Sequence, residues 1–410
     1  MGKIKVGILI FTNKVKERAL SADVFDNKKY YGLKSIIGEL NNNFDIQYIS
    51  TISINTCDYV LIPIISYYDA LNYINEIYGK VFKAKIIVGG PYVLNYHTFS
   101  NAFAVVIGRC EDMINGIFNK EKYTNVVYPD ALQENYEVGS VKRFLCVGDR
   151  NEVAVGCAAK CFFCQYAWKN KYTSIVNSGY NSSLSNYEDY IQNLKATKNG
   201  RYVTAIDGLT ERTRYLVNKK ISNNVIVDKL SEIAENDIAG MVKIYNIVAY
   251  PWEQNVNFEE FIECVNKSDK NNKNKLTIYL THTHFVPKLF TPMEDMQINM
   301  LDARNSILKN PIIYRGKYFK VANNISITSN VSAIEEYIVD RADNEIDILL
   351  IAKIICTNKY KGLNNKIKLK VLQKYFDKYI NGYIGHYRML HTYNIAEVKK
   401  NINKKIINGI

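Results

Sequence analysis

The first 118 residues alternate short apolar runs with amphipathic segments, and this alternation constrains the fold more than any other feature. Apolar runs of strand length lie at 5–11, 44–49, 58–63, 84–88 and 103–108, and helical periodicity lies at 30–40, 67–77 and 111–118. Strands that alternate with helices predict an α/β fold with a parallel, doubly wound sheet. Ligands of such sheets bind beyond the carboxyl ends of the strands. Gly89 and Gly90 follow one strand there, although a tight turn would use two glycines equally well.

Length and composition place the chain among globular proteins. It has 410 residues, of which 47% are hydrophobic and 23% are charged, and this length predicts two or three domains. We find no N-terminal signal pattern and no apolar run of roughly 20 residues that would span a bilayer. We therefore expect a soluble, cytoplasmic protein, in which the eight cysteines do not form a disulfide framework.

Positive charge is concentrated near the C-terminus. The formal net charge is +13, and residues 357–410 hold 12 Lys or Arg against the two acids Asp377 and Glu397. A basic segment of this kind predicts binding to the phosphates of nucleic acid or to an anionic membrane surface. The alternative is an AT-rich coding bias, because the whole chain is rich in Lys, Asn, Ile and Tyr.

Three cysteines form the sharpest local signal. Cys157, Cys161 and Cys164 are separated by three and then two residues, and so short a loop can turn its sulfurs toward one centre. Three thiolates can bind three irons of a cubane cluster and leave the fourth iron open. A structural zinc site would want four protein ligands, and no further Cys or His lies close by. A catalytic zinc site with an open position and metal-free core cysteines stay as alternatives.

The same segment resembles a known family. The spacing CxxxCxxC, with Phe163 before the last cysteine, is similar to that of the radical S-adenosylmethionine enzymes. The resemblance implies a [4Fe–4S] cluster on the three cysteines and S-adenosylmethionine on the open iron. One electron from the cluster would then cleave S-adenosylmethionine to methionine and a 5′-deoxyadenosyl radical. It also implies that Phe163 lies near the adenine, and that an electron donor such as flavodoxin or ferredoxin is a partner.

Segments on both sides of the cysteines resemble one subfamily of these enzymes. Residues 86–91 and 105–111 are similar to a cobalamin-binding-type domain, and similar downstream elements lie at 204–214, 243–253, 285–292 and 341–343. The resemblance implies a Rossmann-like cobalamin-binding-type domain at 1–135 and a partial (β/α) barrel at 136–310. It also implies a mainly helical, basic cap at 311–410 that closes the open side of the barrel. Gly89 and Gly90 would face the corrinoid.

Three departures from the subfamily bear on the cofactors. The segment 23–32 has no histidine where such domains often place a cobalt ligand, and no Gly-Gly-Glu motif follows the cysteines. The stretch between Cys164 and Thr204 is also shorter than the subfamily usually has. The sequence therefore predicts the cluster and S-adenosylmethionine, and it leaves cobalamin open.

Four charged residues follow a predicted strand end, where barrel active sites collect polar groups. These are Asp207, Glu211, Arg212 and Arg214. We expect Asp207 and Arg214 to contact the cofactor and Glu211 and Arg212 to act in catalysis. Arg212 or Arg214 would pair with the methionine carboxylate of S-adenosylmethionine. The alternative is that Glu211 and Arg214 form an i, i+3 ion pair on a solvated helix face.

Further candidates lie on the next predicted strands. Glu253 could mark the adenine or ribose side of the cofactor, or cap the next helix. His282 and His284 alternate along one strand and therefore share a face. If that face lines the barrel, one of them would orient substrate or move a proton, whereas a satisfied buried histidine is the alternative. Tyr245 and Tyr279 could donate hydrogen to a product radical or simply pack.

These features together predict a radical S-adenosylmethionine enzyme. Our first expectation for the reaction is methylation of an unactivated carbon, with methylcobalamin as the methyl carrier. The first alternative is a cobalamin-independent rearrangement or oxidation, in which the N-terminal domain is a scaffold. The second is a binding or sensor protein that uses its cluster structurally.

Overall fold

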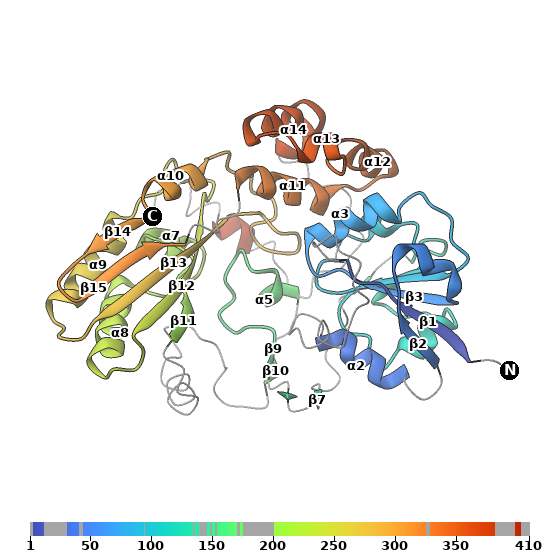
Figure 1. Ribbon diagram of the computed structural model, residues 1–410, viewed down its shortest axis with the longest axis horizontal. Coiled ribbons are helices and arrows are strands. Elements are labelled where there is room, and N and C mark those ends of the chain that lie inside the picture. The colour runs from blue at the N-terminus through green and yellow to red at the C-terminus, as the bar shows by residue number, and fades with distance from the viewer. Residues whose placement is uncertain are drawn as a thin grey trace.

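The protein contains two mostly parallel β-sheets with a set of helices above them (Figure 1). The structure is a computed structural model, and it describes residues 3–11, 31–40, 44–93, 95–133, 136–137, 139, 146–147, 150–151, 154–169, 173–174, 201–324, 329–381 and 398–402. The predicted α/β class is confirmed. Among these residues no helix is both long and apolar enough to cross a membrane.

The N-terminal sheet has six strands in the order β2-β1-β3-β4-β5-β6, and all neighbours are parallel except β5 and β6. Its elements are β1 (Ile4–Ile8), α2 (Tyr31–Leu40), β2 (Phe44–Tyr48), η2 (Thr51–Thr56), β3 (Tyr59–Pro63), α3 (Tyr67–Glu76), β4 (Lys85–Gly89), η3 (Tyr96–Phe99), β5 (Ala104–Val106), α4 (Ile114–Phe118) and β6 (Val126–Val127). Along β3, Val60 and Ile62 belong to one apolar core and Leu61 to the core on the other side. Burial of both faces explains why the strands are continuous apolar runs.

A short connecting region follows and carries the three clustered cysteines. Its elements are β7 (Cys146–Val147), β8 (Arg150–Asn151), β9 (Ala154–Val155), α5 (Gln165–Lys169) and β10 (Thr173–Ser174). Strand β9 pairs with β10, and β7 pairs with β8, both in antiparallel fashion. Helix α5 lies between the two sheets (Figure 1), so the cysteine loop that precedes it is central in the molecule.

The second sheet has the order β11-β12-β13-β15-β14, with only β14 antiparallel. Its elements are β11 (Arg201–Ala205), α7 (Glu211–Leu216), α8 (Asn223–Glu235), β12 (Met241–Val248), α9 (Glu259–Lys270), β13 (Leu276–His284), α10 (Ala303–Lys309), β14 (Ile312–Arg315) and β15 (Phe319–Asn323). The even-numbered residues of β12 and β13, such as Val242 and Ile278, form a core with α8, α9 and α10. The odd-numbered residues point to the other face, because side chains alternate along a strand.

The second sheet extends past the expected boundary at residue 310, since β14 and β15 belong to it. The pairing of β13 with β15 makes this extension part of the parallel sheet. The segment 325–328, which the sequence also favours as a strand, lies outside the described residues.

The C-terminal helices are α11 (Asn330–Arg341), α12 (Glu345–Ile354), α13 (Asn358–Lys361) and α14 (Asn365–Ile380). We expected them to close the open side of the barrel, and this stays a prediction. Their buried residues, such as Ile338 and Tyr379, share one apolar core with Tyr73 of α3 and with Leu289 and Phe290, which follow β13. In Figure 1 the helices lie at the top, above the space between the two sheets and above α3. The cap therefore packs against both domains.

Candidate functional site

The three clustered cysteines lie on a loop between β9 and α5. Cys161 is buried, and Cys157 and Cys164 are partly buried. The loop curls because the Cys164 amide donates to the Cys161 carbonyl at 3.1 Å, and Lys160 before it adopts a positive φ of 50°. The indole of Trp168 donates to the Cys161 carbonyl at 2.8 Å. Side chains and backbone thus hold the three thiols in one short turn.

The cysteine loop is fastened to the end of α7 in the second domain. The amide of Phe162 donates to the carbonyl of Val217 at 2.9 Å. The amide group of Asn218 donates to the carbonyls of Ala159 and Lys160 at 3.2 and 3.0 Å. Because α7 follows β11, these bonds place the thiols beyond the carboxyl end of the second sheet, where ligands of parallel sheets bind.

Two of the three thiols, those of Cys161 and Cys164, have raised pKa values, which bear on whether the loop can hold a metal cluster. The pKa of Cys161 is raised to about 12, mainly by burial and in smaller part by the neighbouring thiols of Cys164 and Cys157. Burial likewise raises the pKa of Cys164. Among the described residues, no three His, Cys, Asp or Glu side chains are grouped to hold one metal ion. A cubane cluster takes each thiolate on a different iron, and its positive irons would stabilise three thiolates that repel one another. The donor set therefore fits such a cluster.

An ion pair lies beside Cys161. Asp207 follows β11 with a positive φ of 52°, and its carboxylate accepts from Lys219 at 2.7 Å. The lysine lowers the pKa of Cys161 and the aspartate raises it, although burial outweighs both. The structure thus brings Asp207 close to the cysteines, and its role toward a cofactor stays a prediction. Lys219 was missed, because nothing in its sequence surroundings distinguishes it from the other lysines.

The expected aromatic neighbour of the cofactor also lies at this end of the sheet. The ring of Phe163 lies 6.5 Å from that of Tyr250, measured between centroids, and Tyr250 lies 4.8 Å from Phe285. The Tyr250 hydroxyl donates to the Asp207 carbonyl at 2.8 Å. These three rings form an aromatic wall that closes the site between the cysteine loop and strands β12 and β13.

Arg214 is engaged in holding its own loop. It is fully buried, and its guanidinium donates to the carbonyls of Ile221 and Gly208 at 2.7 and 2.9 Å and to the side chain of Asn223. The ion pair with Glu211, which was the alternative interpretation, is absent: the Glu211 carboxylate accepts instead from the Asn223 amide at 2.7 Å. These contacts account for Arg214 as a structural residue, and its role toward S-adenosylmethionine stays a prediction.

Arg212 and Glu253 line one cavity of about 320 Å³ together with Thr213 and Trp252. Glu211, the first residue of α7, and Arg212 are both exposed. The carboxylate of Glu253 accepts from the Tyr250 amide at 3.1 Å and from the Thr213 hydroxyl at 3.4 Å. Burial raises the pKa of Glu253 from 4.5 to about 7. A carboxyl group that titrates near neutral pH can exchange a proton there.

The expectation that His282 and His284 act in catalysis is corrected by the face on which they lie. Both have even numbers on β13, and the even-numbered residues of that strand pack against the helices. His282 contacts the side chains of Asn246 and Asn323 at 3.2 and 2.9 Å, and burial lowers its pKa to about 4. The His284 Nδ1 atom lies 2.9 Å from the Phe285 carbonyl, and burial lowers its pKa also. The imidazoles are buried structural groups turned away from the open face of the sheet.

A second cavity, of about 140 Å³, lies at the Gly89–Gly90 end of the N-terminal sheet. Its described lining is mainly apolar, includes Gly32 and Cys110, and has no histidine. Gly90 has a φ of +118°, and a Cβ there would lie 2.5 Å from the Ile64 carbonyl oxygen, so the position requires glycine. A backbone edge without side chains fits the close approach of a large flat ligand such as a corrinoid. The segment 23–30 lies outside the described residues.

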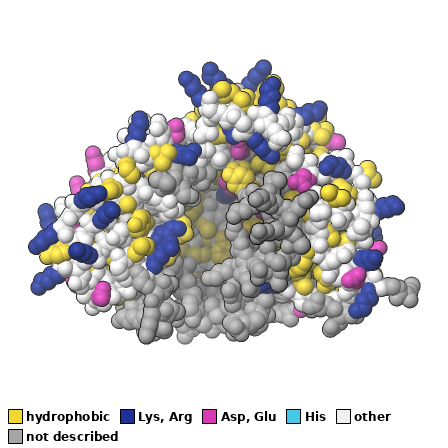
Figure 2. All heavy atoms as spheres, viewed as in Figure 1, with side chains coloured by type: hydrophobic (Ala, Val, Ile, Leu, Met, Phe, Trp, Pro, Cys, Tyr) yellow, Lys and Arg dark blue, Asp and Glu magenta, His cyan; other side chains and the backbone are white. Residues whose placement is uncertain are grey.

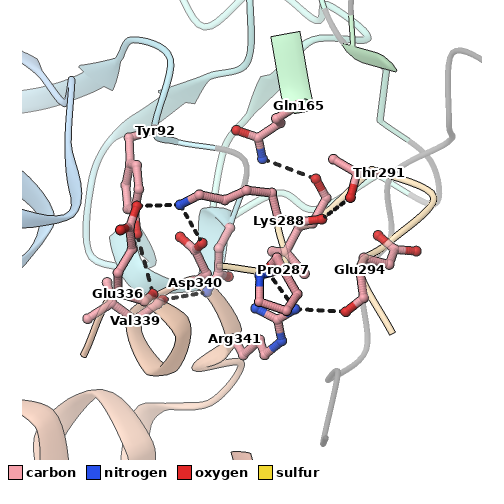
Figure 3. Close-up of polar contacts among 12 residues, drawn as sticks. Tyr92, Gln165, Pro287, Lys288, Thr291, Glu294, Glu336, Val339, Asp340 and Arg341 are labelled. Carbon is pink, nitrogen blue, oxygen red and sulfur yellow. Dashed lines mark hydrogen bonds and ion pairs between the residues drawn. The ribbon is translucent and has the colours of Figure 1, made fainter. Parts of the chain in front are cut away.

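Lys288 joins the two sites (Figure 3). Its ammonium pairs with Glu336, and with Asp340 at 3.1 Å, and lies 5.1 Å from the ring centroid of Tyr92. Burial alone would lower the pKa of Lys288, but the two carboxylates outweigh it and the pKa is raised. Tyr92 lies two residues after the Gly89–Gly90 edge, so α11 and Lys288 connect both domains.

Two neighbouring contacts extend this junction to the cysteine loop. Gln165, the first residue of α5, donates to the Leu289 carbonyl at 3.1 Å. The fully buried Arg341 donates to the carbonyls of Pro287 and Glu294 at 3.0 and 2.8 Å (Figure 3). The junction thus fixes the segment after β13 against both the cysteine loop and α11.

Comparison with known proteins gives limited similarity. No protein-family model and no curated protein matches the chain. Among solved structures, the cobalamin-dependent S-adenosylmethionine radical enzyme OxsB with aqua-cobalamin bound aligns over 85% of this chain and 56% of its own, at 10% identity and a TM-score of 0.30. OxsB with aqua-cobalamin and S-adenosylmethionine bound aligns over 99% of this chain and 62% of its own, at 9% identity and the same TM-score of 0.30. The chain thus spans less than two thirds of the length of OxsB. A likeness this low assigns it to no family.

Replacement of Lys288 by Met should destabilise the protein by about 2–4 kcal/mol, because Glu336 and Asp340 would be left as neighbouring unpaired acids. Urea unfolding followed by circular dichroism measures the change. The triple variant Lys288→Met, Glu336→Gln, Asp340→Asn should recover most of the loss. A loss below about 1 kcal/mol in the single variant would show that the lysine is not the junction described here.

Glu253 should make stability depend on pH with a known sign. A carboxyl group with a raised pKa binds protons more tightly when folded, so its contribution falls as pH rises from about 4.5 to about 7. The variant Glu253→Gln should therefore gain stability relative to the natural protein across that range, by at most about 3 kcal/mol. Urea unfolding of both proteins between pH 5 and pH 8 measures the difference. A difference that is flat with pH would contradict the raised pKa.

Proposed function

We propose that this chain is a radical S-adenosylmethionine enzyme in which Cys157, Cys161 and Cys164 hold a [4Fe–4S] cluster. The observation that carries the proposal is the three-thiol loop fixed beyond the carboxyl end of a mostly parallel sheet. When bound, a cluster with one open iron would hold S-adenosylmethionine and supply the electron for its reductive cleavage.

The residues around the thiols suit that chemistry. The aromatic wall of Phe163, Tyr250 and Phe285 would keep water from the reacting groups. Burial raises the pKa of Tyr250 well above its usual value, so its hydroxyl stays protonated and holds the Asp207 carbonyl. The Asp207 carboxylate in turn fixes the Lys219 ammonium close to Cys161, where its positive charge would offset part of the thiolate charge.

For the reaction we favour methylation of an unactivated carbon with cobalamin as methyl carrier. The glycine edge at Gly89–Gly90 and the apolar cavity beside it support a corrinoid site. The edge is tied to the cysteine loop through Lys288 and also through Lys169 of α5, whose ammonium lies 3.5 Å from the Pro91 carbonyl. The two sites must be held at a fixed distance, because the carbon that the radical activates must also be within reach of the methyl group on the cobalamin.

A cobalamin-independent radical enzyme is the second candidate. It is favoured by one observation, the absence of histidine from the described lining of the cavity at Gly89–Gly90. In that case the N-terminal domain would serve as a scaffold, and the reaction would be a rearrangement or an oxidation.

The variant Cys161→Ala should lose reductive cleavage of S-adenosylmethionine, because one iron would lose its thiolate. We expect 5′-deoxyadenosine to fall by at least about 100-fold when the anaerobically reconstituted protein is assayed with dithionite by mass spectrometry. The matched control is Cys356→Ala, another buried cysteine, located in the C-terminal helices, and it should retain the activity. Equal amounts of 5′-deoxyadenosine from both variants would contradict the catalytic proposal and favour a cluster with a structural role.

Filling the cavity at Gly89–Gly90 should remove the corrinoid. A Cβ on Gly32 would meet no atom within 4 Å, and this residue of α2 lines the cavity. Gly32→Phe should therefore abolish hydroxocobalamin retention on gel filtration, whereas Gly32→Ala should retain it and gain about 1 kcal/mol of helix stability. The visible spectrum after filtration measures both. Failure of the unaltered protein to retain cobalamin would favour the second candidate.

A further inference from the structure

The second sheet has one face that no described helix covers. On β12 and β13 this face carries the odd-numbered residues, since the even-numbered ones form the core with α8, α9 and α10. On β11 it likewise carries odd-numbered residues, and on β15 even-numbered ones, as the strand register requires. None of these positions is Asp or Glu, whereas Arg201, Lys243 and Lys320 occupy three of them. The face is therefore basic and has no acid of its own.

No carboxylate of the described residues neutralises the cations on this face. Among the ion pairs of the described residues, none involves Arg201, Lys243 or Lys320. The Lys243 ammonium instead donates to the Tyr245 hydroxyl at 2.9 Å and lies 4.4 Å from the centroid of that ring. Tyr245 is 41% exposed, and because its oxygen accepts from Lys243, its own O–H is left to donate. Two neighbouring donors thus point to the open face.

The position of Lys243 along β12 places it about one small-molecule length from the residues that pack near the cysteine loop. Ile247, on the same face of β12, packs with Phe163 and Tyr250 of the aromatic wall. Lys243 lies four residues before Ile247, which corresponds to roughly 13 Å along a strand. That separation is close to the length of a small metabolite. On this side the molecule is hollowed near its centre, and Lys or Arg side chains line the margin toward the second sheet (Figure 2).

We propose that this face binds the phosphate group of a small-molecule substrate, with the rest of the substrate extending toward the cysteine loop. The inference rests on the proposed function, and it names the substrate class. A phosphate group carries nearly two negative charges and several acceptor oxygens, and it suits two donors from Lys243 and Tyr245 with further cations on the neighbouring strands. Lys320 extends the basic surface across the sheet, because it pairs in register with Thr277 on β13 and Thr277 pairs with Met241 on β12.

The test uses the full-length chain and ribose 5-phosphate as the probe, with ribose as the uncharged comparison. Isothermal titration should show binding of ribose 5-phosphate that weakens as salt rises, and no binding of ribose. Lys243→Met should weaken the binding about tenfold, and Lys243→Arg should restore most of it, since the loss of one charge-assisted hydrogen bond has about that effect.

The matched control is Lys309→Met, an exposed lysine on α10, which removes the same charge from outside this face. It should leave binding and the thermal unfolding midpoint unchanged. Equal affinity in Lys243→Met and the unaltered protein would overturn the proposal, as would an equal loss in Lys309→Met. The titration needs neither iron nor S-adenosylmethionine, so a negative result discards the phosphate site and leaves the cluster proposal standing. Failure of the cluster to assemble would leave the titration interpretable in the same way.

Discussion

The junction between α11 and the segment that follows β13 depends on a partly buried cation, Lys288. Its ammonium pairs with Glu336 and Asp340 of α11 and lies against the ring of Tyr92. A lysine that is largely removed from water loses several kcal/mol of hydration, which paired carboxylates must offset. The cation therefore fixes three segments at once, because it is stable only where all of them meet. Displacement of α11 would leave the ammonium without its carboxylates, and displacement of Tyr92 would remove the aromatic ring beside it.

Helix α11 therefore connects the N-terminal domain to the segment that follows β13. Helix α11 uses one side for Lys288 and another for the apolar core that it shares with α3. Both contacts join residues far apart in the sequence, and the apolar periodicity of α11 shows only that one side is buried. The sequence predicts a mainly helical cap, but it has no information about which surface the buried side of each helix will meet.

At the candidate site too, the sequence predicts local structure but does not predict contacts between residues far apart in the chain. The strands, the helices and the cysteine turn follow from local patterns, and the structure contains them. The sequence does indicate which face of β13 carries the histidines. Leu276, Ile278 and Leu280 have even numbers, like His282, and therefore lie on the same face of the strand. A face that carries three large apolar residues is the covered face. Lys219 is different, because its place beside Cys161 arises from the chain path after α7, and no local pattern marks it.

Charge differs between the two parts of the candidate site, the region near the cysteine loop and the basic face of the second sheet. Near the cysteine loop, the Lys219 ammonium is paired with the Asp207 carboxylate, and the aromatic wall around Tyr250 shields that region. Further down the sheet the open face carries lysines without acids. A strongly negative ligand would be drawn to that lower region, because attraction between unpaired opposite charges acts over longer distances than contact forces. Its uncharged end would then face the aromatic wall, where apolar atoms replace water most favourably. The separation of these two environments along β12 is what would orient a substrate with one charged end.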